Sequence, residues 1–390
     1  MIPEYYEFCC PVKIISGKQA LANLPYEMGI LHARRALVVA DKGVVGAGLL
    51  KRVERVFEGS GAEIAAVFDE TPPDSSDRVA NRVAKVFADL RCDCFVAVGG
   101  GSVLDTVKGA NMVVSEGTDD LLKLQGAECL RNAPKPFIAV PTTAGTGSEV
   151  TMAAVIHNEE RHIKMAFTSY HLYPHVAILD PAMTLTAPPK ITAATGMDAL
   201  THAIEAYYCL QKNPVSDSFA LAAIRLVMAN LTTCVTDSHN DDARLAMANA
   251  ALLAGISFSN SMVGVVHALA HACGGVCRVP HGVANAILLP WGMESNIAKV
   301  GPIIAELGPV LGADTSGNVE QRAYSAVGAV RALAERLKVV CGLPTTLHEA
   351  GVTEDALDAV ARTATNDGAV MFNPEEVDFD AALAILKKAF

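Results

Sequence analysis

The sequence lacks a run of lysine or arginine residues, a CxxC cysteine pair and a basic, apolar leader, and each absence excludes a class of protein. The net charge of −11 argues against a nucleic-acid partner, because phosphate binding needs a basic face. Ten scattered cysteines without CxxC spacing indicate reduced thiols and a cytoplasmic protein. The first ten residues, MIPEYYEFCC, carry acids where a secretory signal has a basic segment.

Charged residues are also absent from Leu245 to Cys277, a stretch long enough to suggest a membrane-spanning helix. Asn249, Asn260 and His267 interrupt this stretch, as do several serines and glycines, so buried helices in a bundle core explain it better. We therefore expect no membrane partner. A chain of 390 residues with 51% apolar and 19% charged residues is globular and long enough for two domains.

The first half of the chain alternates short apolar runs with amphipathic segments, as in a parallel sheet covered by helices. Expected strands span residues 35–41, 62–69, 94–100, 136–142 and 176–180, and expected helices include residues 48–61 and 76–91. From Pro188 onward, long Ala- and Leu-rich helical patterns replace the strands. We predict a Rossmann-like α/β domain over residues 1–188 and an all-α domain over residues 189–390.

One carboxylate and three imidazoles in the second half have a spacing that suits a divalent metal. Asp198 and His202 are four residues apart in a helical segment, so both leave the same helix face. His267 lies in a second apolar segment, and His281 follows Pro280 in a turn that opens another helix. Nitrogen and oxygen ligands without a thiolate suit Fe²⁺ or Zn²⁺ in a catalytic site. Each histidine could instead be a hydrogen-bonded core residue.

Two turns that follow predicted strands have the composition of a nucleotide site. Gly99-Gly100-Gly101-Ser102 lies between an apolar strand and a helix, where free N–H groups and the helix dipole attract a pyrophosphate. No GxGxxG follows the first predicted strand, but Asp41 ends it and can accept bonds from ribose hydroxyls. Asp41 would serve equally well as a helix N-cap. The loop PTTAGTGSEVT (141–151) carries five hydroxyl residues that can bind a ribose.

Four motifs together resemble the iron-containing, or group III, alcohol dehydrogenase family, and the resemblance covers nearly the whole chain. They are GGGSVLDTVKGAN (99–111), VPTTAGTGSEVT (140–151), MDALTHAIEAY (197–207) and VVHALAHACGGVCRVPHGVANAILLP (265–290). The family has an α/β dinucleotide domain followed by a helical metal domain, and its members are dimers. This chain has Val103 where the family usually has Pro, and Glu375 where the family usually has Arg.

The resemblance assigns roles residue by residue. It implies NAD binding by Asp41, Gly99, Gly100, Gly101, Ser102, Asp105, Thr142, Thr143, Thr146, Gly147 and Lys164. It implies metal binding by Asp198, His202, His267 and His281, and it makes His271 a non-ligand beside the nicotinamide and a candidate proton relay. An acid at position 41 disfavours NADP by repulsion. Family resemblance favours Fe²⁺, while related glycerol dehydrogenases use Zn²⁺ with the same ligand set.

The predicted function is therefore metal-dependent, NAD-linked interconversion of small primary alcohols, diols or hydroxyacids with their carbonyls, in a cleft between the two domains. A glycerol dehydrogenase-like enzyme and a lyase of the dehydroquinate synthase type are the alternatives. The lyase would handle a polyanionic substrate, yet residues 196–290 hold few basic residues: Lys212, Arg225, Arg244 and Arg278. A metal-binding module without catalysis would leave the nucleotide loops unexplained.

Overall fold

The computed structural model describes residues 3–390, so the first two residues of the segment MIPEYYEFCC lie outside it. The chain divides into two compact units. The sheet unit contains residues 10–143 and 147–186. The helical unit contains residues 187–390 together with residues 144–146 and the N-terminal segment up to Cys9. Every strand of the described chain belongs to the sheet unit.

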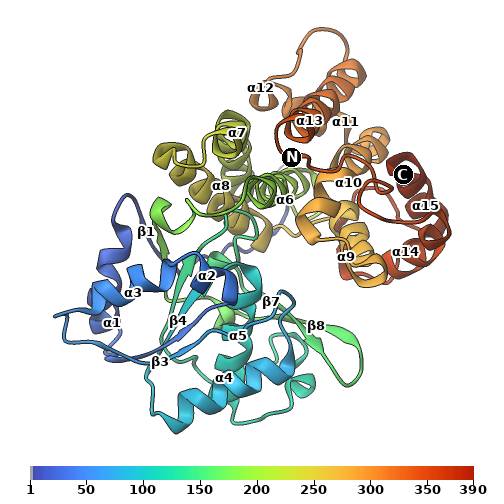
Figure 1. Ribbon diagram of the computed structural model, residues 1–390. Coiled ribbons are helices and arrows are strands. Elements are labelled where there is room, and N and C mark those ends of the chain that lie inside the picture. The colour runs from blue at the N-terminus through green and yellow to red at the C-terminus, as the bar shows by residue number, and fades with distance from the viewer. Residues whose placement is uncertain (1–2) are drawn as a thin grey trace. The chain divides into compact units, whose positions relative to one another are not determined.

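The sheet unit is built on a six-stranded parallel sheet in the order β1-β9-β6-β4-β2-β3 (Figure 1). Its strands are β1 (Lys13–Ser16), β2 (Arg35–Val39), β3 (Glu63–Phe68), β4 (Cys94–Gly99), β6 (Phe137–Pro141) and β9 (Val176–Leu179). Five of them confirm the predicted strands. The edge strand β1 was not predicted, because its four residues are mostly exposed and lack the apolar run of a buried strand.

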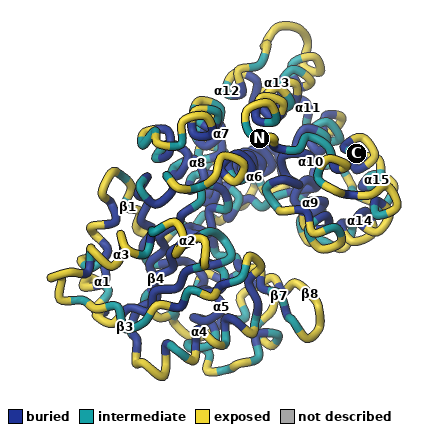
Figure 2. The backbone as a smooth tube through the Cα atoms, viewed as in Figure 1, coloured by how far each residue is buried: buried dark blue, intermediate teal, exposed yellow. Residues whose placement is uncertain are grey.

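Alternate residues of each central strand pack on opposite faces of the sheet, which is why both faces carry helices. In β2, Ala36 and Val38 join the core beneath α1 (Leu24–Ile30) and α3 (Leu49–Phe57). Leu37 and Val39 join the opposite core, beneath α4 (Asp77–Asp89) and α5 (Gly101–Glu116). Figure 2 shows the central strands as buried backbone between more exposed helices.

The sheet unit also contains a short helix and a second sheet. Helix α2 (Lys42–Gly46) follows β2. A second, three-stranded sheet has the order β5-β8-β7, formed by β5 (Gly126–Ala127), β7 (Ala153–Asn158) and β8 (Ile163–Thr168).

The helical unit carries one continuous apolar core, to which its long helices contribute. Its helices are α6 (Pro189–Tyr208), α7 (Pro214–Thr236), α8 (Asp241–Ser259), α9 (Val265–Cys277), α10 (His281–Ser295), α11 (Ile297–Glu306), α12 (Gly308–Leu311), α13 (Val319–Cys341), α14 (Leu357–Ala364) and α15 (Phe379–Ala389). The uncharged stretch 245–277 forms most of α8, a connection and α9. Of the described residues, α7 alone passes a length and composition test for a membrane span, and 39% of its tested window is buried.

A glycine allows α10 to approach α9 closely. A Cβ added at Gly292 would lie 2.3 Å from Cγ2 of Val266, whose branched side chain is stiff.

We expect Gly292→Ala to lower the free energy of unfolding by about 1–3 kcal/mol through overpacking. Gly328 in α13 is the matched control, because a Cβ there meets nothing within 4 Å. Gly328→Ala should raise the free energy of unfolding by up to about 1 kcal/mol through helix propensity. Urea titration measures the free energy of unfolding of both variants. The same change in Gly292→Ala and Gly328→Ala would contradict the close packing of α10 on α9.

Candidate metal and nucleotide sites

The helical unit brings Asp198, His202, His267 and His281 together, and one ligand atom of each lies within 4.8 Å of the others. Helix α6 supplies Asp198 and His202 from one face, as their spacing predicted. His267 lies in the first turn of α9, and His281 is the first residue of α10. A Cβ at Gly282 would lie 2.6 Å from the carbonyl oxygen of Ala194, so the absence of a side chain lets the start of α10 approach α6.

Asp198 lies at the centre of this cluster and is only 2% exposed. Its Oδ1 lies 3.5 Å from Nε2 of His281 and 4.0 Å from Nε2 of His267. Asn285, one turn after His281 in α10, donates to the same oxygen over 2.6 Å. The same Asn285 nitrogen lies 3.1 Å from Nε2 of His281 and 3.4 Å from Nε2 of His267, so the amide contacts the carboxylate and both imidazoles.

The two buried imidazoles are kept in the neutral state that a metal ligand needs. Burial lowers the pKa of His267 well below its ordinary value, and repulsion from His202, His281 and His271 lowers it further. Burial also lowers the pKa of His202, although Asp198 opposes the shift. Neutral imidazoles have a free nitrogen lone pair to offer a cation.

The donor set fits a divalent cation in this place. The buried Nδ1 of His202 has no hydrogen-bond partner, and neither has the buried Oδ1 of Asn285. Leaving a buried polar atom without a partner costs free energy, so these two atoms indicate a site that binds a further polar group or a cation. The buried carboxylate of Asp198 lies beside these imidazoles, and a cation would balance its charge.

His271, the predicted relay, lies one turn beyond His267 in α9 and stays 41% exposed at its side chain. Its ring stacks on that of His281, with centroids 5.2 Å apart and planes inclined by 13°. Its Nδ1 lies 2.8 Å from Oδ2 of Asp367. The His271 bond lowers the pKa of Asp367 in spite of the opposing effect of burial. His271 therefore contacts both the cluster and solvent.

In the sheet unit, the predicted nucleotide residues gather at the carboxyl ends of adjacent strands. The strands β6, β4 and β2 are neighbours. Strand β4 ends at Gly99, Thr142 directly follows β6, and Asp41 lies two residues after β2. Gly99 to Ser102 connects β4 to α5, whose N-cap is Gly100 and which no side chain caps. A Cβ at Gly100 would lie 3.1 Å from Oγ1 of Thr143, so the loop that follows β6 passes close to this turn. This edge is where open parallel sheets bind dinucleotides.

Other predicted nucleotide residues already have protein partners. The N-cap of α2 is Asp41, whose Oδ1 accepts the N–H of Val44 over 2.8 Å, as the N-cap alternative predicted. Asp105 accepts from Ser148 Oγ over 3.0 Å and from Val155 N over 3.1 Å.

The remaining predicted positions lie in the loop after β6 and in β8. Lys164, in β8, pairs with Asp74 over 3.1 Å. Gly147 adopts φ 61°, which favours glycine, and starts the turn at residues 148–150. Thr146 clusters with the helical unit, whereas Thr142 and Thr143 belong to the sheet unit.

Sequence reasoning missed residues that hold the predicted ones in place. Glu205 continues the face of α6 three residues after His202, and Asn285 lies four residues after His281. That helical spacing was a signal for both. Asp367 and Asn373 come from the C-terminal region and had no local signal.

A parallel sheet with a glycine turn, together with a helical unit that gathers one carboxylate and three imidazoles, has the sites of an enzyme that uses a nucleotide and a metal. Residues 11–181 match the family described as iron-containing alcohol dehydrogenase. Residues 192–390 match the C-terminal part of the Fe-containing alcohol dehydrogenase family. The chain belongs to the iron-containing alcohol dehydrogenase family, whose members are NAD-linked oxidoreductases acting on CH–OH donors.

Named relatives support this placement over the full length. The chain is 37% identical over 388 residues to 1,3-propanediol dehydrogenase of Klebsiella pneumoniae, covering 99% of each. It is 34% identical to NAD-dependent methanol dehydrogenase of Bacillus methanolicus, covering 98% of this chain and 99% of that protein. A solved 1,3-propanediol oxidoreductase superposes with a TM-score of 0.95 at 36% identity, covering 99% of this chain and 100% of that one.

Proposed function

We propose that Asp198, His202, His267 and His281 hold one divalent cation, Fe²⁺ with Zn²⁺ as the alternative, and that the glycine turn and loops of residues 1–188 hold NAD. In this proposal residues 189–390 form the metal and catalytic domain. The observation that carries it is the convergence of four ligand atoms within 4.8 Å, with an unpartnered buried nitrogen on His202. A bound cation would supply Lewis acidity toward the substrate hydroxyl, and NAD⁺ would supply the hydride acceptor.

The chain's own groups orient the substrate and move its proton. With the three imidazoles and Asp198 bound to the cation, no basic side chain of the cluster would be left to take a proton. His271 is the group placed to carry the hydroxyl proton away, since it contacts His281 on one side and is part-exposed on the other. Asp367 holds the ring of His271 through Nδ1 and leaves Nε2 for the proton.

The substrates that we propose are small primary alcohols, diols and hydroxyacids with their carbonyl products. Relatives named for 1,3-propanediol and methanol support the small size. The ring of Phe258 stacks on His202, with centroids 4.2 Å apart, and presents an apolar surface beside the cluster. Reduction of NAD⁺ with a panel of C2 to C6 alcohols, diols and hydroxyacids tests this class.

Replacing one ligand should remove both metal and activity. We expect the anaerobically purified protein to hold one metal ion per chain by elemental analysis. His281→Ala should reduce both the metal content and the rate of alcohol oxidation. The loss should exceed the factor of about 10–100 that is typical when a residue hydrogen-bonded to a metal ligand is replaced. His239→Ala is the matched control. His239 is exposed, and its ring contacts the hydroxyl of the neighbouring Ser238. Full metal content and undiminished rates in His281→Ala would contradict the proposal.

Asp41 should determine the preference for NAD over NADP. Its carboxylate can bind the ribose hydroxyls, and its charge repels the additional phosphate of NADP. Asp41→Ser removes the charge but keeps an oxygen that can cap α2. We expect the ratio of kcat/KM for NAD⁺ to that for NADP⁺ to fall by roughly tenfold, as loss of a charged hydrogen bond predicts. Steady-state kinetics with both cofactors measures it. Equal or better turnover of the unmodified protein with NADP⁺ would defeat the assignment.

We also propose a homodimer in the cytoplasm. The dimer rests on the family resemblance and the cytoplasmic location on the ten free cysteines. Light scattering of the purified protein tests the dimer.

A further inference from the structure

The first turn of α9 has no capping side chain of its own. Its N-cap is Gly264, and a helix N-terminus leaves N–H groups that need partners. Two side chains from other elements supply them. Glu205, in α6, accepts from Val266 N over 2.8 Å and from His267 N over 3.3 Å. Asn373, from the C-terminal region, accepts from Val265 N over 3.2 Å.

Gly264 is required by this arrangement. A Cβ there would lie 2.7 Å from Oδ1 of Asn373 and 3.1 Å from Oε1 of Glu205. Asn373 is itself held by Asn296, which donates to it over 3.0 Å and accepts from it over 2.9 Å. The side chains of Glu205 and Asn373 therefore approach the start of α9 so closely that only glycine fits at position 264.

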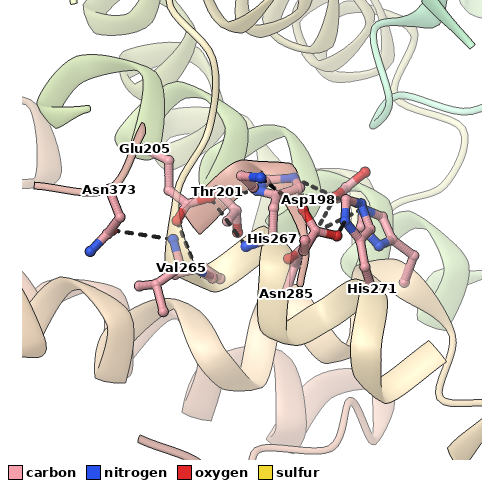
Figure 3. Close-up of polar contacts among 12 residues, drawn as sticks. Asp198, Thr201, Glu205, Val265, His267, His271, Asn285 and Asn373 are labelled. Carbon is pink, nitrogen blue, oxygen red and sulfur yellow. Dashed lines mark hydrogen bonds and ion pairs between the residues drawn. The ribbon is translucent and has the colours of Figure 1, made fainter. Parts of the chain in front are cut away.

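Glu205 makes one contact that a helix cap does not need. Its Oε2 lies 2.5 Å from Nδ1 of His267, and Glu205 is completely buried. Burial raises the pKa of Glu205 to about 7, and the backbone N–H groups that it accepts from oppose this shift and favour the carboxylate. Beside a carboxylate, Nδ1–H of His267 is the donor in this bond. The opposite nitrogen, Nε2, faces Asp198. Figure 3 shows His267 between Glu205 and Asp198, with Glu205 and Asn373 converging on the start of α9 at Val265.

We propose that Glu205 is a positioning residue for the metal site, which fixes His267 in the tautomer that carries hydrogen on Nδ1 and presents the Nε2 lone pair to the cation. This inference rests on the proposed metal site. Carboxylates that accept from a ligating imidazole fix the ring orientation and tautomer in this way and make the ligand more basic. Asn373 differs, because it caps the same helix without touching the His267 ring.

The test compares Glu205→Gln with Asn373→Ala in the full-length chain. The Gln nitrogen cannot accept a hydrogen bond. If its oxygen keeps the bond to Val266, its amide group faces His267 Nδ1 and imposes the opposite tautomer. Competition with a chromogenic chelator measures Zn²⁺ affinity, and thermal unfolding without metal measures the loss of the cap. We expect Glu205→Gln to bind Zn²⁺ about 10–100-fold more weakly. Asn373→Ala should lose stability and keep its Zn²⁺ affinity.

The outcomes separate this inference from the proposed function. If the unmodified chain binds no stoichiometric Zn²⁺, the metal site itself fails. If it binds one Zn²⁺ that requires His281, while Glu205→Gln binds equally well, only the role of Glu205 is overturned. Equal weakening in Glu205→Gln and Asn373→Ala would show that Glu205 acts only as a cap, which also overturns it.

A second measurement does not depend on a folded variant. Neutron diffraction from the zinc-loaded, unmodified protein locates the hydrogens of His267 directly. We expect hydrogen on Nδ1 and none on Nε2. Hydrogen on Nε2 would overturn the inference.

Discussion

The structure depends on a buried carboxylate that has no positive side chain beside it. Asp198 is 2% exposed, and its near neighbours are the imidazoles of His267 and His281 and the amide of Asn285. A buried charge needs a counter-charge or a dense set of hydrogen bonds, and here the amide of Asn285 supplies one such bond. Helix α6 supplies Asp198, and the close starts of α9 and α10 bring the imidazoles to it.

The metal cluster could be predicted because its signals are local. The four-residue spacing of Asp198 and His202 is a property of one helix, and the Pro-His-Gly turn marks the start of another. The residues that support the cluster were harder to find. Glu205 and Asn285 have helical spacing, but a buried Glu or Asn on a helix has many uses until its partner is known. Asn373 reaches α9 from 108 residues along the chain, and no local pattern encodes that contact.

The central strands of the sheet could also be predicted from local signals, whereas the short strands β1 and β5 could not. Central parallel strands are buried on both faces, so they form apolar runs that end in turn residues. The edge strand β1 has no such run, and the short strand β5 has only two residues. The nucleotide residues were identified as turn positions. Their partners were not, and Asp105, which turns both oxygens to Ser148 and Val155, shows why a motif position alone does not give a side chain's contacts.

The central claim is that one cation lies among Asp198, His202, His267 and His281. Anomalous diffraction from crystals of the anaerobically purified protein, recorded on both sides of the iron and zinc absorption edges, tests it most directly. The account predicts one anomalous peak in the helical unit, bonded to all four side chains, with nitrogen ligands at about 2.0–2.2 Å. A peak bonded to other residues, or full occupancy with any of the four side chains turned away, would contradict it.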